Sequence, residues 1–252
     1  MTCLTYSRVS STKVSRILLT HTLGLPYDVG DPEILKWSQS VGRTDWAMSW
    51  NHNGFNTPTK FAPGEGWLYG PALDWAGFVL EAVTGSTLGA YMQSLIFDPL
   101  SMTDTGFWPE RLSADISDRA VEPVERSQET GKLEGRSPWP PAEHESESGG
   151  AGLYSTPQDY AKFLKAFLNG ELLSEKSMSE IFTPQLNDKQ RAAMETLAYG
   201  DAHLGFAPEF PKGQPINHGL AGVINTTDVP GKRQAGSIEW SGMVNSRWVS
   251  YP

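Results

Sequence analysis

Apolar residues recur at helical spacing in three long stretches, and the most regular of them covers residues 87 to 97. Its apolar positions follow the i, i+3, i+4, i+7, i+8 pattern of a helix with one buried face. These positions are Leu88, Tyr91, Met92, Leu95 and Ile96. Pro99 ends the helix because proline lacks an N–H donor and clashes with the preceding turn. We therefore predict a helix over residues 87–97 whose apolar stripe belongs to the core.

A second stripe runs from Leu73 to Thr84 and has a turn signal on each side. Residues 62–66, Ala-Pro-Gly-Glu-Gly, predict a tight turn because proline fixes φ and glycine permits positive φ. Gly85 is well placed as the residue just past the end of the helix.

The third stripe begins with several helix-start signals together. Thr156 can cap the helix, Pro157 suits its first position and Asp159 suits its first turn. A buried stripe then runs to Leu168, and Gly170 ends the helix.

Weaker patterns fill the remaining chain. We expect further helices over residues 14–24, 31–37, 174–182 and 187–197. Residues 109–148 carry many prolines and charges with little periodicity, so we expect loops with weak strands. Short strands or loops are expected over residues 203–206, 219–225, 236–242 and 245–252.

Composition narrows the classes of function. A chain of 252 residues with 38% apolar residues and nine tryptophans is typical of a soluble globular protein. Its net charge of −9 argues against nucleic-acid binding, which needs clustered Lys and Arg. Cys3 is the only cysteine, so no intrachain disulfide can form. No apolar run approaches the ~20 residues that span a bilayer, and residues 1–16 lack the apolar region of a signal peptide. We expect a cytoplasmic protein with neither a membrane nor a nucleic-acid partner.

Three sequence features, two histidines and a glycine cluster, could belong to a binding or catalytic site. For each of them a purely structural role is favoured. His21 closes an apolar helix and is expected to be a buried, hydrogen-bonded histidine. His144 lies in an acidic run without a second histidine at ligand spacing, so no metal site is predicted. The glycine cluster at 149–152 lacks both phosphate-binding patterns. We expect no cofactor and no metal.

Tyr69 lies in the short link between the turn and the helix that starts near Leu73. Rigid neighbours can aim a side chain at such a place into a cleft. Its position alone favours the simpler alternative, a core tyrosine with a satisfied hydroxyl.

Tyr69 also stands within an ordered series of short motifs. The series reads PG…W-x-Y-G-P-x-L-D-x-A-G…E-x-V-T-G…Y…I-F-D-P-L-x-M-x-D-T-G-F. It resembles the serine β-lactamase-like superfamily, in particular class C β-lactamase relatives and esterase or transesterase members such as the lovastatin-type acyltransferases. The resemblance implies an α+β, β-lactamase/transpeptidase-like fold with a helical subdomain plus a partial antiparallel sheet.

The same resemblance implies a catalytic role for Tyr69. In that family the tyrosine belongs to a Y-x-N motif and works with the serine and lysine of an upstream S-x-x-K. Here the motif reads Tyr69-Gly70-Pro71, and proline offers no side-chain hydrogen bond where the family has asparagine. This departure suits an ester substrate better than a β-lactam.

The resemblance also implies a substrate-binding strand. Trp240, Ser241 and Gly242 match the W-x-G that esterase and transesterase members carry as their third motif. The N–H of Met243 is a candidate oxyanion donor. The glycine segment is expected to form the floor of the site, and residues 26–60 to lie over it. Aromatic candidates for the acyl pocket are Trp37, Trp46, Trp50 and Phe55.

The nucleophile is the weakest part of the pattern. One S-x-x-K occurs, from Ser10 to Lys13, and about one such match is expected by chance. Lys13 stands almost directly before Ile17, which leaves no room for the helix and loop that the family places between the two motifs. Ser10 and Lys13 are nevertheless the candidate nucleophile and base that the sequence offers.

Two hypotheses remain open. The chain is a serine acyltransferase or esterase of secondary metabolism, or it is an inactive remnant or binding module without a working nucleophile. We assign residues 14–248 to an incomplete β-lactamase-related domain and residues 1–13 to a segment of uncertain structure. Two explanations for an incomplete domain compete: a truncated or misread coding sequence, or a decayed paralogue. The expected partners are a small-molecule acyl donor and an alcohol acceptor. A carrier protein or another thioester is a candidate for the donor.

Overall fold

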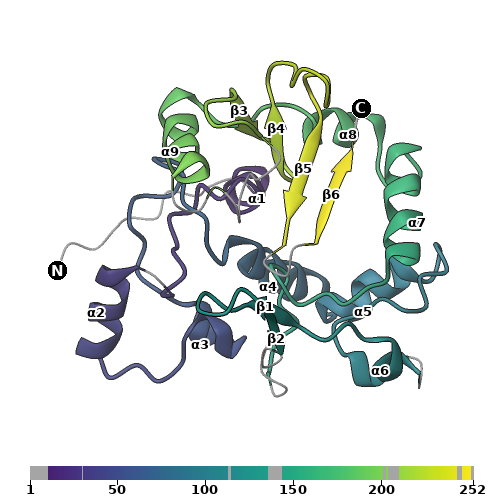
Figure 1. Ribbon diagram of the computed structural model, residues 1–252, viewed down its shortest axis with the longest axis horizontal. Coiled ribbons are helices and arrows are strands. Elements are labelled where there is room, and N and C mark those ends of the chain that lie inside the picture. The colour runs from purple at the N-terminus through teal and green to yellow at the C-terminus, as the bar shows by residue number, and fades with distance from the viewer. Residues whose placement is uncertain are drawn as a thin grey trace.

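The last four described strands, within residues 216–250, form an antiparallel sheet, and helices from earlier parts of the chain lie beside it and below it in this view (Figure 1). The computed structural model describes residues 11–29, 31–112, 115–135, 144–200, 203, 210–242 and 246–250. The sheet order is β3-β4-β5-β6. Its strands are β3 (Ile216–His218), β4 (Val223–Asn225), β5 (Ile238–Ser241) and β6 (Arg247–Ser250). In β5 and β6, Trp240 faces Trp248 across the ladder.

Helices flank the sheet at both edges (Figure 1). Next to β3 packs α9 (Asp188–Tyr199), which begins with a capping box of Asn187 and Gln190. Beyond β6 in this view lie α7 (Pro157–Leu168) and α8 (Glu175–Ile181). The predicted start of α7 is confirmed, because Thr156 accepts a hydrogen bond from the Asp159 N–H.

The first half of the chain is mainly helical. Here α1 (Ser11–Leu19) packs against α4 (Ala72–Thr84), whose predicted end at Gly85 is confirmed by a φ of 71°. The remaining elements are short. They are α2 (Pro32–Ser40), η1 (Ala47–Ser49), α3 (His52–Phe55), α5 (Leu88–Met92), η2 (Gln93–Phe97), η3 (Pro109–Arg111), α6 (Ile116–Arg119), and the paired strands β1 (Val124–Arg126) and β2 (Leu133–Gly135). The predicted α+β class, with helices followed by an antiparallel sheet, is confirmed.

Two helix predictions need correction. The helix over residues 87–97 turns into a π-helix at η2, so its side chains rotate out of the expected stripe. Leu95, which we predicted to be core, is therefore 53% exposed. The first helix ends at Leu19 instead of near Gly24, because His21 takes up a positive φ of 56° just past its end.

The expected strand over residues 203–206 lies mostly outside the described residues, since only His203 is described there. The sequence patterns also missed β3, whose three residues are all buried and carry no polar alternation.

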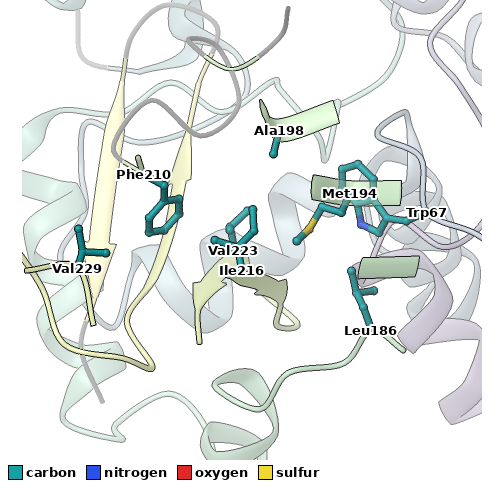
Figure 2. Close-up of a cluster of buried hydrophobic side chains, with 8 residues drawn as sticks. All are labelled: Trp67, Leu186, Met194, Ala198, Phe210, Ile216, Val223 and Val229. Carbon is teal, nitrogen blue, oxygen red and sulfur yellow. The ribbon is translucent and has the colours of Figure 1, made fainter. Parts of the chain in front are cut away.

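A buried hydrophobic cluster joins the loop before α4 to the sheet (Figure 2). Its members are Trp67, Leu186, Met194, Ala198, Phe210, Ile216, Val223 and Val229. Tyr69 and Trp240 are partly buried and pack against it. The core therefore holds in place the two residues that the motifs singled out.

Met194 is completely buried in this cluster, so we expect Met194→Ala to destabilise the protein by about 2–5 kcal/mol through lost burial and a cavity. Urea denaturation monitored by tryptophan fluorescence measures this change. Leu95→Ala is the control, because its exposed side chain predicts a change within about 0.5 kcal/mol. Equal losses in the two variants would contradict the assignment of the core.

Candidate active site

Tyr69 is fixed by a close approach of two backbone segments. The Leu68 N–H donates to the carbonyl oxygen of His21 at 3.0 Å. A Cβ on Gly70 would lie only 1.9 Å from the carbonyl oxygen of Leu25, so glycine is required at that position. Tyr69 therefore stands between two anchored neighbours, next to residues 21–27.

The Tyr69 ring is surrounded by other rings. Its centroid lies 5.0 Å from His21, 5.5 Å from Trp240 and 5.6 Å from Tyr27. The structure thus brings Tyr69 together with the strand that carries the W-x-G motif, although 171 positions separate Tyr69 and Trp240 in the chain. Tyr27 is a part of this group that the sequence analysis missed.

The Tyr69 hydroxyl keeps its proton strongly. Burial, and after it the charge of Asp74, raise the pKa of Tyr69 to about 12, while a hydrogen bond with Tyr27 acts in the opposite direction. The pKa of Tyr27 is also raised well above its ordinary value, mainly by burial. Both phenols are therefore neutral near pH 7 and can donate a hydrogen bond.

Two buried histidines stand beside this group. The rings of His21 and His218 lie 5.6 Å apart, and both contact Trp240. Burial, and then His218, lower the pKa of His21 to about 3; burial lowers the pKa of His218 to about 4. Both rings are therefore uncharged at neutral pH.

The prediction for His21 is confirmed as to burial, since only 2% of the residue is exposed. Its Nδ1 has no hydrogen-bond partner among the described residues, so the expected hydrogen bonding fails at that atom. The positive φ of His21 is unusual for a residue other than glycine, and it turns the ring toward Tyr69 and Trp240.

A cavity of about 310 Å³ opens beside these rings between α1, α4, α7 and the sheet. No residue of its lining carries a formal charge at neutral pH. The lining consists of Leu19, His21, Leu73, Gly150, Tyr160, Phe163, Phe167, His218, Leu220, Ala221, Trp240 and Trp248. The cavity is therefore suited to an apolar group.

The aromatic residues expected to line the acyl pocket do not border this cavity. Trp50 and Phe55 are almost fully buried, whereas Trp46 is 44% exposed. Trp37 packs under the guanidinium of Arg43 at 5.6 Å. The physical reason is that Trp50 packs against His144 and Phe55 against Phe78, whereas the cavity is lined by the end of α1, by His21 and Leu73, and by residues from 150 onward.

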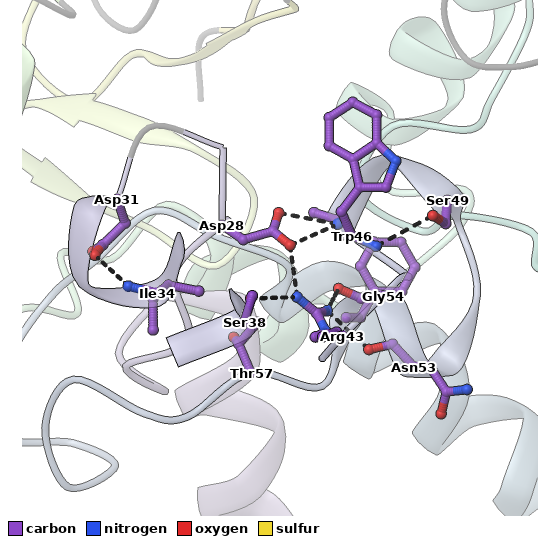
Figure 3. Close-up of polar contacts among 12 residues, drawn as sticks. Asp28, Asp31, Ile34, Ser38, Arg43, Trp46, Ser49, Asn53, Gly54 and Thr57 are labelled. Atoms are coloured by element: carbon purple, nitrogen blue, oxygen red, sulfur yellow. Dashed lines mark hydrogen bonds and ion pairs between the residues drawn. The ribbon is translucent and has the colours of Figure 1, made fainter. Parts of the chain in front are cut away.

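A buried ion pair holds that segment together (Figure 3). The Arg43 guanidinium donates to Asp28 Oδ2 at 2.7 Å and to the carbonyl oxygens of Asn53 and Gly54. The other Asp28 oxygen accepts from the Ala47 N–H at 3.0 Å. Because Asp28 follows Tyr27 directly, the pair also fixes the backbone that presents Tyr27 to Tyr69.

The remaining predicted residues are placed as follows. Lys13 is exposed on α1. It precedes Leu19, which lines the cavity, by six residues, so the two residues are separated by roughly 9 Å along the helix axis. Ser10 and Met243 lie outside the described residues. Ser241 ends β5, and the Gly242 N–H donates to the carbonyl oxygen of Ser246 at 2.7 Å.

Within the described part of the chain, no group of three or more His, Cys, Asp or Glu residues could hold a metal ion. Nor is any helix of that part long and apolar enough to cross a membrane.

Comparison with known proteins gives consistent matches. The Beta-lactamase family profile matches residues 15–252. Lovastatin esterase of Penicillium rubens is 34% identical over 248 residues, covering 92% of this chain and 59% of the relative. Monacolin J acid methylbutanoyltransferase of Aspergillus terreus is 31% identical, covering 94% of this chain and 58% of the relative. The chain thus spans less than two thirds of these curated relatives.

Solved structures agree in fold. A mutant of simvastatin synthase from Aspergillus terreus superimposes with a TM-score of 0.83 at 31% identity, covering 94% of this chain and 56% of that one. The hydrolase EstCE1 superimposes with a TM-score of 0.67 at 18% identity and supports the fold alone.

The lowered pKa values of His21 and His218 predict how the free energy of unfolding depends on pH. Their folded pKa values lie below the unfolded value near 6.5, so the unfolded chain binds more protons and stability falls as pH drops below 6.5 toward 4 and 3. The slope is expected to reach about 1.4 kcal/mol per pH unit for each histidine. Urea denaturation between pH 4.5 and 7.5 measures it. His218→Asn should reduce the slope, because it removes one of the two buried imidazoles; an unaltered slope in this variant would contradict the assignment.

Proposed function

The chain belongs to the beta-lactamase family, and from that premise we propose that it serves acyl transfer, as an acyltransferase or esterase of secondary metabolism that works through an acyl-enzyme. The observation that carries the proposal is the contact between Tyr69 and Trp240, because Trp240 lines an uncharged cavity and Tyr69 packs directly behind it. An ester would place its acyl group in that cavity and its carbonyl carbon near the Tyr69 hydroxyl.

The chemistry assigned to Tyr69 is proton transfer. A serine hydroxyl attacks the ester carbonyl while its proton passes toward the phenol side of the site, and the departing alcohol takes up a proton as the acyl-enzyme forms. Water or a second alcohol then attacks the acyl-enzyme, which gives hydrolysis or transfer. A phenol whose pKa is about 12 holds its proton at neutral pH, so a nearby cation is needed before Tyr69 can act as a base.

An ester is a better candidate substrate than a β-lactam. Pro71 is buried two positions after Tyr69 and has no side-chain group that could bind a substrate amide. The names of the relatives point the same way, since they describe an esterase and a methylbutanoyltransferase. The cavity lining supports a bulky apolar acyl group or alcohol.

Finer assignments belong to the same proposal. We place the activity within residues 14–248, with Trp240, Ser241, Gly242 and Met243 binding the acyl group. A carrier-protein or other thioester donor is proposed because thioesters are the usual activated acyl donors. A cytoplasmic location is proposed on the grounds that the single Cys3 cannot form an intrachain disulfide.

One observation favours the alternative of a binding module without catalysis. Lys13 is exposed, and the cavity lining contains no lysine. Loss of a nucleophile from such a site lowers the rate about a millionfold, which binding residues cannot restore. The Ser10–Lys13 pair therefore remains a hypothesis that experiment has to decide.

A single experiment separates the two possibilities. The chain is incubated with p-nitrophenyl butanoate while p-nitrophenolate release and intact mass are followed. Acyl transfer predicts a butanoyl adduct on a serine, and peptide mapping shows whether that serine is Ser10. Tyr69→Phe should slow adduct formation by about 10²–10⁴-fold because the proton-transferring hydroxyl is lost.

Tyr91→Phe is the matched control, since Tyr91 is a partly buried tyrosine of α5 that borders neither Tyr69 nor the cavity. It should react like the unsubstituted chain. Absence of both adduct and turnover would overturn the catalytic proposal for this chain and support the binding module. Adding a primary alcohol and measuring the butanoyl ester formed distinguishes transfer from hydrolysis.

A further inference from the structure

Phe167 of α7 lies between two hollows of the protein. It lines the cavity of about 310 Å³ described above, and only 7% of the residue is exposed. A second and more open hollow, of about 460 Å³, is bordered by the end of α7 and by α8; we call it the α7–α8 groove. Its lining consists of Leu168, Met178, Ser179, Phe182 and Thr183.

Two aromatic rings in contact separate the cavity from the groove. Phe167 borders the cavity, and Phe182 borders the groove. The centroids of the two rings lie 5.9 Å apart, which is an ordinary distance for a packed aromatic pair. At this contact the thickness of the two rings is therefore what keeps the two hollows apart.

The spacing of residues along α7 explains this arrangement. Tyr160, Phe163 and Phe167 fall on one face of the helix and form a row of rings along the cavity, with successive centroids 5.6 and 6.1 Å apart. Leu168 follows directly and points about 100° further around the helix, toward the groove. Phe167 is thus the ring of the row that stands at the boundary.

Both hollows suit an apolar and narrow occupant. No residue in the lining of either one carries a formal charge at neutral pH. A linear hydrocarbon chain can pass an opening as wide as one ring. Each methylene that such a chain moves out of water raises its affinity about fourfold.

We propose that Phe167 determines how long an acyl chain the cavity accepts, because its ring closes the cavity toward the α7–α8 groove. A chain that has reached this ring gains nothing from further methylenes. That the bound chain is an acyl group rests on the proposed function. The closure itself is a property of binding and does not depend on turnover.

The test measures how linear methyl ketones of increasing chain length bind to the full protein. These ketones carry a carbonyl and an apolar chain, as an ester does, but cannot be hydrolysed. Titration of tryptophan fluorescence reports binding, since Trp240 and Trp248 line the cavity. In the unsubstituted protein the affinity should rise about fourfold per methylene and then level off at a limiting length. A steady rise without a limit would overturn the proposal.

In Phe167→Ala the limiting length should increase, because the cavity then opens into the groove. A ketone two methylenes longer than the original limit should bind on the order of 10-fold more tightly than it binds the unsubstituted protein. Phe167→Leu is the second variant, since loss of a whole buried ring can prevent folding. It should give a smaller increase, and an unchanged limit in the folded variants, or in Phe167→Leu if it alone folds, would overturn the role of Phe167.

Phe78→Ala is the matched control. Phe78 is a partly buried phenylalanine of α4 that packs against Phe55 and Trp75 and lines neither hollow. Its loss removes the same ring and should leave the limiting length unchanged. An increase equal to that in Phe167→Ala would show a general loosening of the fold and would count against a specific role of Phe167.

A second substitution tests where the longer chain goes. Ser179 lies in the groove on α8 and is exposed, so α8 should tolerate a larger side chain there. Ser179→Trp in the Phe167→Ala background should fill the groove and restore the original limit. A limit that stays long would overturn the extension into the groove.

The ketone series and the ester assay can fail independently. If no ester is turned over, the ketones still decide whether Phe167 limits the chain length. If the limit does not move in the Phe167 variants, the butanoate experiment still decides whether the protein transfers acyl groups. Where both succeed, the longest p-nitrophenyl ester that reacts efficiently should lengthen in Phe167→Ala together with the ketone limit.

Discussion

The site depends on one close approach, in which the backbone of residues 60–70 runs against the backbone of residues 21–25. Hydrogen bonds from Lys60, Gly64 and Leu68 to carbonyl oxygens of the facing segment hold the two together. The missing side chain of Gly70 allows its backbone to lie directly against the carbonyl oxygen of Leu25. Without this contact neither Tyr69 nor His21 would reach β5, and the cavity would lose one wall.

The contact also sets the electrostatics of the site. It buries rings that would otherwise titrate near neutrality and leaves them uncharged, and burial also raises the pKa of Asp74. The overall charge of −9 therefore says little about the cavity, whose lining is neutral. Such surroundings accommodate an apolar group better than a charged one.

Local signals in the sequence were sufficient for the features that depend on neighbouring residues. Thr156 with Pro157 marked a helix start, and Gly85 marked a helix end, because capping is chemistry within a few residues. The order of motifs was sufficient to expect Tyr69 beside Trp240.

Features created by distant packing could not be predicted in this way. No local pattern shows that His218 of β3 meets His21, or that Tyr27 shares a hydrogen bond with Tyr69. The positive φ of His21 contradicts the ordinary preference of a histidine and is imposed by its surroundings. Of the proposed catalytic pair, Ser10 lies outside the described residues and Lys13 is exposed, so motif spacing alone leaves that assignment a hypothesis.

The Asp28–Arg43 pair has a consequence for the motions open to the protein. Separating two such buried charges strands each of them in apolar surroundings, which costs several kcal/mol. Arg43 thus connects Asp28 to Gly54. Because of this connection, we expect the stretch between them to move as a unit and a single loop within it not to move alone. Because Tyr27 directly precedes Asp28, any such displacement would move Tyr27 relative to Tyr69.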